Sequence, residues 1–348
     1  MSEKLAGSTP TEPQTGATEV GDWVGVLPGD KNSSTRQHRI HQGRWRTDVA
    51  HWPAGQPQND VRVRARYATL PNWLAETHDG RDVSQTAINL MSDEALAYTH
   101  ERLKALKLID GKAEPDRLWR NLLSSQPLAF SLAGHLHRRQ DEAAVLLSSL
   151  TGLRISKLGR LEAGDGVGKG HRLDGIDAEW FPPRGEHTQD MSGSDIASCV
   201  ELQDGQRVLV TVEVKYTDTF SAAPVTWSPR YEPHLAALGL EPASLSALVD
   251  AGCSQVLRQV MITDSVRRQG VAPDAGSGAQ VHSGLAVVLA REDDQTARRV
   301  VDALDQAVGA IIPVRFWSHR QVFDEARKID TLSSWADRLA GRYLIAVP

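Results

Sequence analysis

One stretch of the chain, residues 192–218, constrains the fold more than any other because it encodes two neighbouring strands and the turn between them. Asp204-Gly205 is a strong hairpin signal, and residues with high strand propensity lie on both sides of it. From residue 208 to residue 214 every second residue is a valine, so the valines point to one side of the strand and predict a buried face. The opposite side ends in an acid and a base, Glu213 and Lys215, at the carboxyl end of the strand.

The length of the turn decides which residues lie opposite each other. A two-residue turn would pair Ile196 with Glu213 and would place Asp195 on the valine face. A three-residue turn, with Gly205 in the left-handed conformation, pairs Ile196 with Val212 instead. It also places Asp195 directly opposite Glu213. Because a slip of one residue turns every side chain to the other face, we expect the register that matches apolar residues, with both acids and the lysine on one face.

These three side chains suggest a specific chemistry. Two carboxylates that lie opposite each other repel and raise each other's pKa unless a cation lies between them. The oxygen atoms of Asp195 and Glu213 suit Mg2+ or Mn2+, with water at the remaining positions. The ammonium group of Lys215 can hold a water molecule in line with a phosphodiester and stabilise the charge that develops. The set therefore predicts metal-assisted hydrolysis of a phosphodiester.

An Asp near the start of one strand, followed by Glu-x-Lys late in the next, resembles the pattern of the PD-(D/E)XK nuclease superfamily. The SD…EVKYT wording, and NLLSSQPL and FSLAGHL further upstream, are similar to uncharacterised restriction-endonuclease-like members. The resemblance implies that Asp195 and Glu213 bind metal and that Lys215 is catalytic. The usual proline before the aspartate is Ser194 here, a departure that leaves the metal ligands intact. The alternative for the three residues is an exposed salt bridge at a sheet edge.

Two helices offer further candidates for this site. On the helix predicted from Ser254 onward, Gln255 and Gln259 share a face, with Arg258 alongside. A glutamine on the helix after the Glu-x-Lys strand resembles an accessory active-site feature of the superfamily, and an ordinary polar face is the alternative. On the helix before the sheet, the resemblance offers Glu142 as a further metal-binding carboxylate, against a role as a solvated acid at a helix start.

We expect three segments along the chain. Residues 1–34 are rich in Ser, Thr, Gly, Pro and acidic residues without periodicity, which predicts a disordered tail. Residues 35–115 form a largely helical N-terminal segment that packs on the core. Residues 116–348 form the core, in which the order helix, strands, hairpin, helix and strand predicts an α/β fold. The resemblance implies a restriction-endonuclease-like core with a mixed central sheet flanked by helices.

The N-terminal segment begins with a basic stretch that we expect to be helical, with a solvated face or contacts to a nucleic-acid backbone as alternative interpretations. After it, alternating arginines would line one face of a strand between Val61 and Trp73. The arginines of the helix are Arg36, Arg39, Arg44 and Arg46, and those of the strand are Arg62, Arg64 and Arg66.

Composition sets the outer limits. The chain has 348 residues, of which 40% are hydrophobic and 24% charged, enough for one large domain or two small ones. Its formal net charge of −5 argues against a broadly basic coat but not against a local basic groove. Cys199 and Cys253 are too few for a disulfide framework or a four-cysteine zinc site. No apolar run approaches a membrane span and no signal-peptide core is present, so we expect no membrane partner and a cytoplasmic location.

Together these observations lead us to expect a divalent-metal-dependent endonuclease whose partner is nucleic acid, and we favour DNA over RNA. The resemblance also suggests defence against foreign DNA, and it allows a homodimer because restriction-like enzymes often pair to cut both strands. The sequence itself shows no clear dimer interface. The alternatives are an RNA nuclease, an exonuclease on DNA ends, and a catalytically silent nucleic-acid-binding protein of the same fold. A chance D…ExK pattern in an unrelated α/β domain would make the three side chains diverge.

Overall fold

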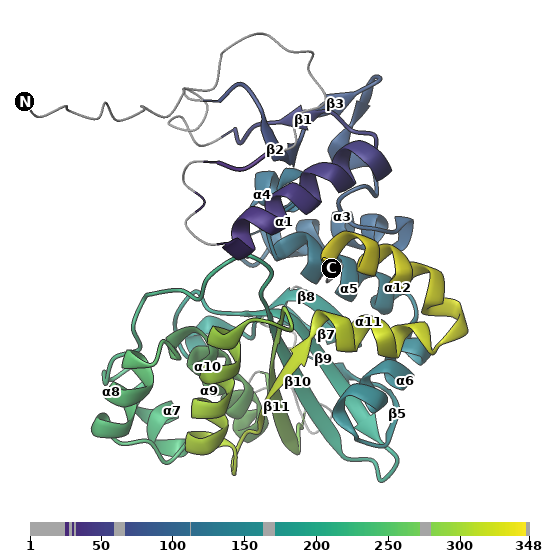
Figure 1. The fold of residues 1–348 in the computed structure, drawn as a ribbon. Helices are drawn as coiled ribbons and strands as arrows, with labels where there is room; N and C mark the ends of the chain where they lie inside the picture. Colours follow the sequence, from purple (N-terminus) through teal and green to yellow (C-terminus); the bar gives the residue numbers. More distant parts are fainter. Residues whose placement is uncertain are drawn as a thin grey trace, which may run out of the picture.

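The computed structural model of the chain describes residues 25–27, 30, 33–58, 67–111, 113–162, 171–271 and 280–345. At its centre is a six-stranded mixed sheet in which β12, β11, β10, β9 and β5 follow one another and β8 also pairs with β9 (Figure 1). Strands β10, β11 and β12 are parallel, whereas β9 is antiparallel to β10, β5 and β8. The strands are β5 (Ile155–Leu158), β8 (Ile176–Trp180), β9 (Ser194–Leu202), β10 (Arg207–Val214), β11 (Ser283–Ala290) and β12 (Val314–Ser318).

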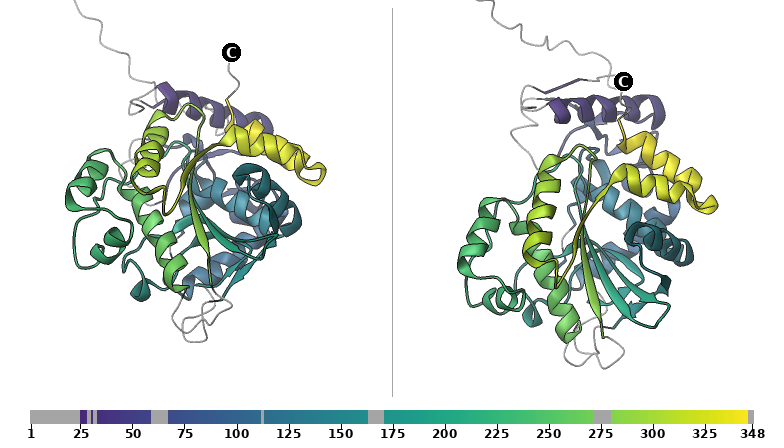
Figure 2. Two further views of the ribbon diagram at one scale, coloured as in Figure 1. Left: turned by 90° about the horizontal axis from the view of Figure 1, so that it is seen from below. Right: turned by 60° about the horizontal axis from the view of Figure 1, so that its bottom comes forward.

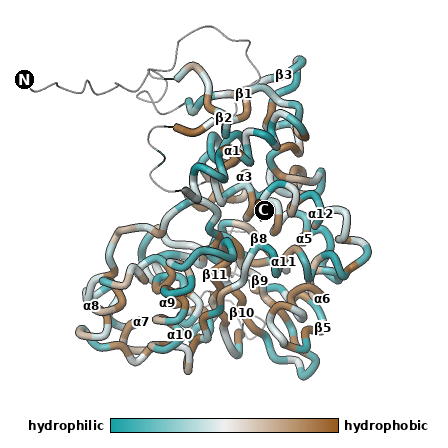
Figure 3. Tube along the Cα trace, viewed as in Figure 1, coloured by the Kyte–Doolittle hydropathy of each residue, from teal (hydrophilic) through white to brown (hydrophobic). Residues whose placement is uncertain are grey.

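The hairpin between β9 and β10 has the predicted register. Val208 pairs with Val200 and Val212 with Ile196, as the three-residue turn requires. Gly205 has a φ of 82°, the left-handed conformation in which glycine avoids a steric clash. The valines of β10 are buried, and apolar residues are concentrated along the central strands (Figure 3).

Helices cover both faces of this sheet (Figure 2). The valine face packs against α5 and α6, which precede the sheet, and against α11 and α12 at the C-terminal end of the chain. The opposite face packs against α9 and α10, and α7 and α8 join the same buried cluster. The α/β fold with a mixed central sheet flanked by helices is therefore confirmed. The helices are α5 (Gln126–His137), α6 (Gln140–Thr151), α7 (Glu232–Ala237), α8 (Pro242–Asp250), α9 (Ser254–Gln269), α10 (Gln295–Val308), α11 (His319–Arg327) and α12 (Asp330–Tyr343).

The N-terminal segment contains helices and short strands. Its buried residues Trp52, Leu74 and Tyr98 belong to the same apolar cluster as the valines of β10, so this segment packs on the core. The position of a domain boundary near residue 115 stays a prediction. The elements are α1 (Ser33–Arg44), a π-helical turn (Trp45–Val49), β1 (Ala54–Gly55), β2 (Leu70–Leu74), β3 (Thr77–His78), β4 (Arg81–Asp82), a 3-10 turn (Val83–Gln85), α3 (Asp93–Lys107) and α4 (Pro115–Arg120). Later in the chain lie the short pair β6 (Arg160–Leu161) and β7 (Leu173–Asp174) and a 3-10 turn (Arg184–Glu186).

The structure corrects the interpretation of the basic helix. Arg39 is only 9% exposed and donates to Asp30 through Nε at 2.8 Å and Nη2 at 2.7 Å. Arg46 is fully buried and donates to the carbonyl of Trp52 at 2.7 Å. A solvated or nucleic-acid-facing role is therefore wrong for these two arginines, whereas Arg36 and Arg44 are exposed.

Some predictions fall on residues that the structure does not describe. Arg62, Arg64 and Arg66 all lie outside the described residues. Most of the tail predicted over residues 1–34 also lies outside them. Within that range Asp30 is described and is buried, in contrast to the prediction for the tail.

Candidate active site

The carboxyl end of β10 holds a buried ion pair. Lys215 Nζ lies 2.9 Å from Glu213 Oε1, and the two side chains are 6% and 4% exposed. Both are on the face of β10 that turns towards α9, because Thr211, two residues earlier, bonds Thr263 of that helix at 2.7 Å. A buried pair of this kind differs from the exposed salt bridge that was the alternative interpretation.

Asp195, near the start of β9, reaches the same point. Extending the observed register by one pair places it opposite Glu213. Its Oδ2 accepts a hydrogen bond of 2.7 Å from the backbone N–H of Val214, and the residue is half-buried. The structure thus brings Asp195, Glu213 and Lys215 together on one face, as the register predicted.

Gln255 connects the acid and the lysine. Its Nε2 donates to Glu213 Oε1 at 2.6 Å, and its Oε1 accepts from Lys215 Nζ at 3.1 Å. The residue is in the first turn of α9, the helix that was expected to contribute a glutamine. Because one amide group fixes both charged side chains, Gln255 holds the pair in a single geometry.

The other two candidates on α9 lie differently. Gln259 is one turn further along the helix and is only 1% exposed, and neither polar atom of its side chain has a hydrogen-bond partner among the described residues. Arg258 turns to the loop before β9 and to the loop after β10. Its Nε lies 3.7 Å from Asp190 Oδ2, and its Nη2 donates to the carbonyl of Ala223 at 2.6 Å. Arg258 therefore ties loops together, and the structure does not bring it to the ion pair.

Glu142 is also not brought to this site. Its carboxylate accepts a hydrogen bond of 3.1 Å from Thr331 of α12 and lies 3.8 Å from Arg139. The start of α6 faces α12 at this point, so the acid is directed to a neighbouring helix. The expectation that Glu142 supplies a metal-binding carboxylate has no support in this arrangement.

The sequence reasoning missed a third acid, Glu179 of β8. The pairs Ala178–Ile196 and Trp180–Ser194 place it directly opposite Asp195 of β9. Its φ is 49°, a strained conformation for a residue with a side chain, and its Oε1 accepts from Gln126 Nε2 at 3.1 Å. The only available signal was its position in the strand, and no short turn joins β8 to β9 to reveal their pairing.

The acids and the lysine influence one another strongly. Burial, with the negative charges of Glu213 and Glu179, raises the pKa of Asp195 well above its usual range. Burial also raises the pKa of Glu179 to about 7. A hydrogen bond from Gln126 lowers this pKa, and the charge of Glu213 raises it further. Burial alone would lower the pKa of Lys215, but the Glu213 and Asp195 carboxylates raise it, so the amine is protonated at neutral pH. The ammonium group thus balances Glu213 and Asp195 in part, and Glu179 adds a further acid beside Asp195.

Comparison with known proteins agrees with this geometry. The family described as the PD-(D/E)XK nuclease superfamily matches the chain over residues 29–345. The chain belongs to the PD-(D/E)XK nuclease superfamily. Membership of this superfamily suggests a nuclease, and the match includes the N-terminal segment as well as the sheet. No curated protein and no solved structure shows a significant match. Across the described residues, no helix combines the length and the apolar character that crossing a bilayer requires.

A loop covers the ion pair of this superfamily member. After β10, Asp218 fixes the loop to the start of α5, where its Oδ2 accepts from a backbone N–H at 2.7 Å. The ring of Phe220 lies 5.1 Å from Lys215 Nζ, and the N–H of Ser221 donates to Gln255 Oε1 at 2.7 Å. The loop therefore contributes to the burial of the lysine.

The donor set fits a divalent ion of the kind that PD-(D/E)XK nucleases typically use. Among the described residues, no three His, Cys, Asp or Glu side chains are close enough to hold a metal by themselves. Mg2+ usually needs fewer protein ligands, since one or two carboxylates, substrate phosphate oxygens and water complete its shell. Asp195 and Glu213 supply two carboxylates from adjacent strands, and the pKa of Asp195 is raised first by burial and then by the charges of Glu213 and Glu179. A cation would relieve this repulsion.

Proposed function

We propose that the protein is a divalent-metal-dependent endonuclease that hydrolyses phosphodiester bonds in DNA. The observation that carries the proposal is the buried pair of Glu213 and Lys215, held by Gln255 and faced by Asp195 from the next strand. Membership of a nuclease superfamily supports the same reaction class. The proposal goes beyond membership of the superfamily in two respects: the substrate is DNA, and the cut is internal to the strand.

The two acids would hold Mg2+ or Mn2+ between the strands. When bound, such an ion supplies Lewis acidity and neutralises charge on the phosphate. Asp195 is fixed by the N–H of Val214 and Glu213 by Gln255, so neither carboxylate needs to reorganise to meet the ion. The chain's own contribution is thus a pair of oriented oxygen donors.

Lys215 would act as a donor and not as a base. Its raised pKa keeps the ammonium group protonated, so it can orient a water molecule or stabilise negative charge on the phosphate. In the structure its proton donors are directed to Glu213 and Gln255. A bound cation would neutralise the Glu213 carboxylate in place of Lys215. The ammonium group would then be free to bind the substrate.

The loop that begins at Asp218 has to move before a phosphodiester can reach these groups. Counted over the whole residue, Glu213 and Lys215 are 3% and 5% exposed, which leaves no room for a nucleic-acid backbone. The segment between Phe220 and the buried Val225 is largely exposed and has no regular secondary structure, so its displacement costs few buried contacts. Opening would expose Lys215 and leave the sheet unchanged.

The test is incubation of the protein with supercoiled plasmid, linear DNA and RNA, each with Mg2+ or with EDTA. We expect nicked and linear plasmid only with Mg2+, and no products from the Asp195→Ala variant. Equal cleavage by the wild type and by Asp195→Ala would reject the proposed site. Cleavage confined to RNA or to DNA ends would replace DNA endonuclease activity with one of those activities.

A further inference from the structure

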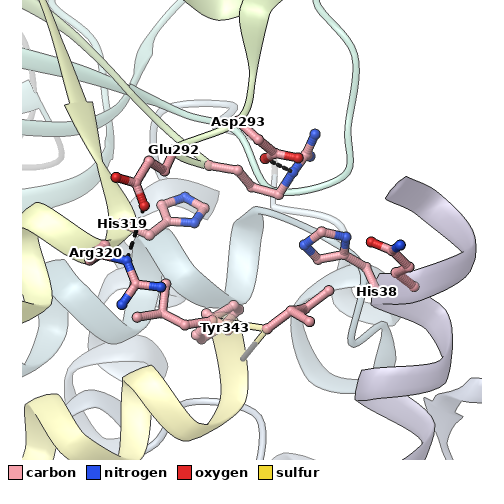
Figure 4. A pocket seen from close by; sticks show the side chains of 10 residues that line it. His38, Glu292, Asp293, His319, Arg320 and Tyr343 are labelled. Carbon is pink, nitrogen blue, oxygen red and sulfur yellow. Dashed lines mark hydrogen bonds and ion pairs between the residues drawn. The ribbon is translucent and has the colours of Figure 1, made fainter. Parts of the chain in front are cut away.

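A cavity separate from the ion pair lies beside the ends of the parallel strands, and we call it the His319 pocket. Its volume is about 320 Å3, within the range of roughly 300–1,000 Å3 typical of ligand sites. Its walls include Arg291, which follows β11, and His319, which follows β12. Figure 4 shows the imidazole rings of His319 and His38 directed towards the cavity from opposite walls. Ligands of α/β proteins commonly bind at this carboxyl edge of a sheet.

Two histidines of the pocket wall pack against the residue that follows the proposed catalytic lysine. Tyr216, which follows Lys215, lies with its ring 5.1 Å from that of His38 and 6.0 Å from that of His319. Arg291 Nη1 donates to the backbone carbonyl of Tyr216. The backbone that carries Lys215 therefore lies beside residues of this pocket.

His319 is buried beside the backbone of Lys215. It is fully buried, and neither ring nitrogen has a hydrogen-bond partner of ordinary geometry among the described residues. Burial and the nearby Arg291 charge lower the pKa of His319 to about 3, against a weak hydrogen bond between one ring nitrogen and the backbone of Lys215. The ring is therefore neutral at physiological pH, with one nitrogen as a donor and the other as an acceptor. At least one ring nitrogen is thus left without a partner, which is costly for a buried polar group and points to a ligand that completes it.

His38 supplies a similar group on the opposite wall. Burial lowers its pKa to about 4, so this ring is also neutral. Its Nδ1 lies 2.8 Å from the carbonyl of Ser34, which fixes the proton on Nδ1. The other ring nitrogen is then an acceptor. Together the two histidines offer donors and acceptors without charge.

The charges around the pocket argue against a phosphate as the occupant. Arg291 Nε lies 3.1 Å from Asp293, and Arg320 Nε lies 3.0 Å from Glu292. Each guanidinium group at the rim is thus paired with an acid of the same wall, which leaves no excess positive charge for an anion. Tyr343, with two aliphatic residues after it, adds apolar surface. An uncharged flat group with donors and acceptors on its edge matches this lining.

We propose that the His319 pocket binds a nucleobase, whose edge bonds to His319 and His38. The proposal rests on the proposed nuclease function, because a substrate strand at Lys215 would bring a base within reach. Enzymes that act on nucleic acids commonly bind unstacked bases in pockets through hydrogen bonds to the base edge. A free nucleotide would present the same chemistry, and the experiment separates the two sources.

The test measures binding of labelled oligonucleotides by fluorescence anisotropy, with Ca2+ in place of Mg2+. Each oligonucleotide carries one abasic residue, and the series moves this residue along the strand. We expect wild-type affinity to fall about 10-fold at one position, in line with the 1–3 kcal/mol that a bound base contributes. His319→Phe, which keeps the ring and removes both nitrogens, should bind the intact strand about 10-fold more weakly and should not respond to that abasic position.

His135→Phe is the matched control. His135 is also a buried histidine, with its Nε2 unpartnered and its ring 4.2 Å from Trp335, but it does not line the pocket. The His135→Phe variant should keep the wild-type dependence of affinity on the position of the abasic residue. If His319→Phe does not fold, His38→Phe takes its place and should show the same effect.

Free nucleosides provide the second arm. If the abasic series is flat but nucleosides raise the melting temperature of the wild type and not of His319→Phe, the base comes from a free nucleotide. A flat series without any effect of nucleosides would overturn the proposal. Absence of any oligonucleotide binding by the wild type would reject the nuclease function instead.

Discussion

Two regions of the molecule bury charged side chains, and they do so in opposite ways. In the N-terminal segment, Asp30 is held by two hydrogen bonds from Arg39. Burial alone would raise the pKa of Asp30, but the bonds from Arg39 and from the N–H of Leu27 lower it below the usual value. Both charges of this pair have a partner, so the pair behaves as part of the core.

On the face that Asp195 shares with Lys215, by comparison, negative charges outnumber positive ones. Asp195 and Glu179 both have raised pKa values, because burial and neighbouring acids disfavour their charged forms. A protein that only needed stability would not place three acids beside one another on neighbouring strands. The difference teaches that buried charge is structural where it is paired, and indicates function where a further cation is needed to balance it.

The largest expected effect is on catalysis. Asp195→Asn keeps the side-chain shape and the acceptor for the N–H of Val214, but it removes a metal ligand. We expect cleavage to fall at least about 1,000-fold, as when a group that acts directly in the transition state is lost. Without metal, the variant should unfold at the same or a higher temperature, because one repelling charge is gone. Plasmid cleavage and thermal denaturation check the two outcomes, and a clear loss of stability would contradict this view of the site.

The matching change in the N-terminal segment should have the reverse outcome. Arg39→Met leaves Asp30 buried without its partner, so we expect a loss of about 3 kcal/mol in the free energy of unfolding. Cleavage per folded molecule should stay within about twofold of the wild type, since additivity holds for distant sites. Urea denaturation and plasmid cleavage test this. A strong loss of activity in the folded variant would mean that the two regions are coupled.

A smaller effect concerns pH. The pKa of Glu179 is raised to about 7, so the stability it contributes is present below its ordinary pKa and is lost as pH rises through 7. Glu179→Gln should therefore gain stability relative to the wild type between pH 6 and pH 8.5. The comparison of the two proteins is essential, because buried neutral histidines act in the other direction. His135 and His187, with pKa values of about 4, reduce stability as pH falls below their usual value. If the melting temperatures of wild type and Glu179→Gln changed with pH in the same way, the raised pKa of Glu179 would be refuted.

The smallest effect concerns the loop over the lysine. Phe220→Ala removes a ring that lies 5.1 Å from Lys215 Nζ, a contact of the cation–π type. We expect Lys215 to react about 5-fold faster with an amine reagent, measured by mass spectrometry, given about 1 kcal/mol for such a contact. Thr219→Ala, at an exposed position of the same loop, is the control. An unchanged rate in Phe220→Ala would show that the loop does not restrict access.

Local signals explain what the sequence could predict. The turn at Gly205 and the alternation of valines fixed the register of the hairpin, and with it the position of Asp195 opposite Glu213. The position of Gln255 followed from its place at the start of the next helix. These features depend on residues close in sequence, whose geometry turn chemistry and periodicity largely determine.

Contacts between distant residues explain the errors. Arg39 is buried because Asn72, far along the chain, accepts from it together with Asp30. Glu142 is directed to Thr331, a residue of the last helix. Glu179 reaches the site through the pairing of β8 with β9, which no turn signal announces. Such contacts follow from tertiary packing, which no local pattern in a single sequence reveals.

The most direct measurement of the central claim is calorimetric titration of the metal-free protein with Mn2+, performed for wild type, Asp195→Asn and Arg39→Met. The unbalanced acids predict that the wild type and Arg39→Met bind the ion equally and that Asp195→Asn loses this binding. Equal binding by Asp195→Asn and the wild type would show that the acids of β9 and β10 do not form the metal site.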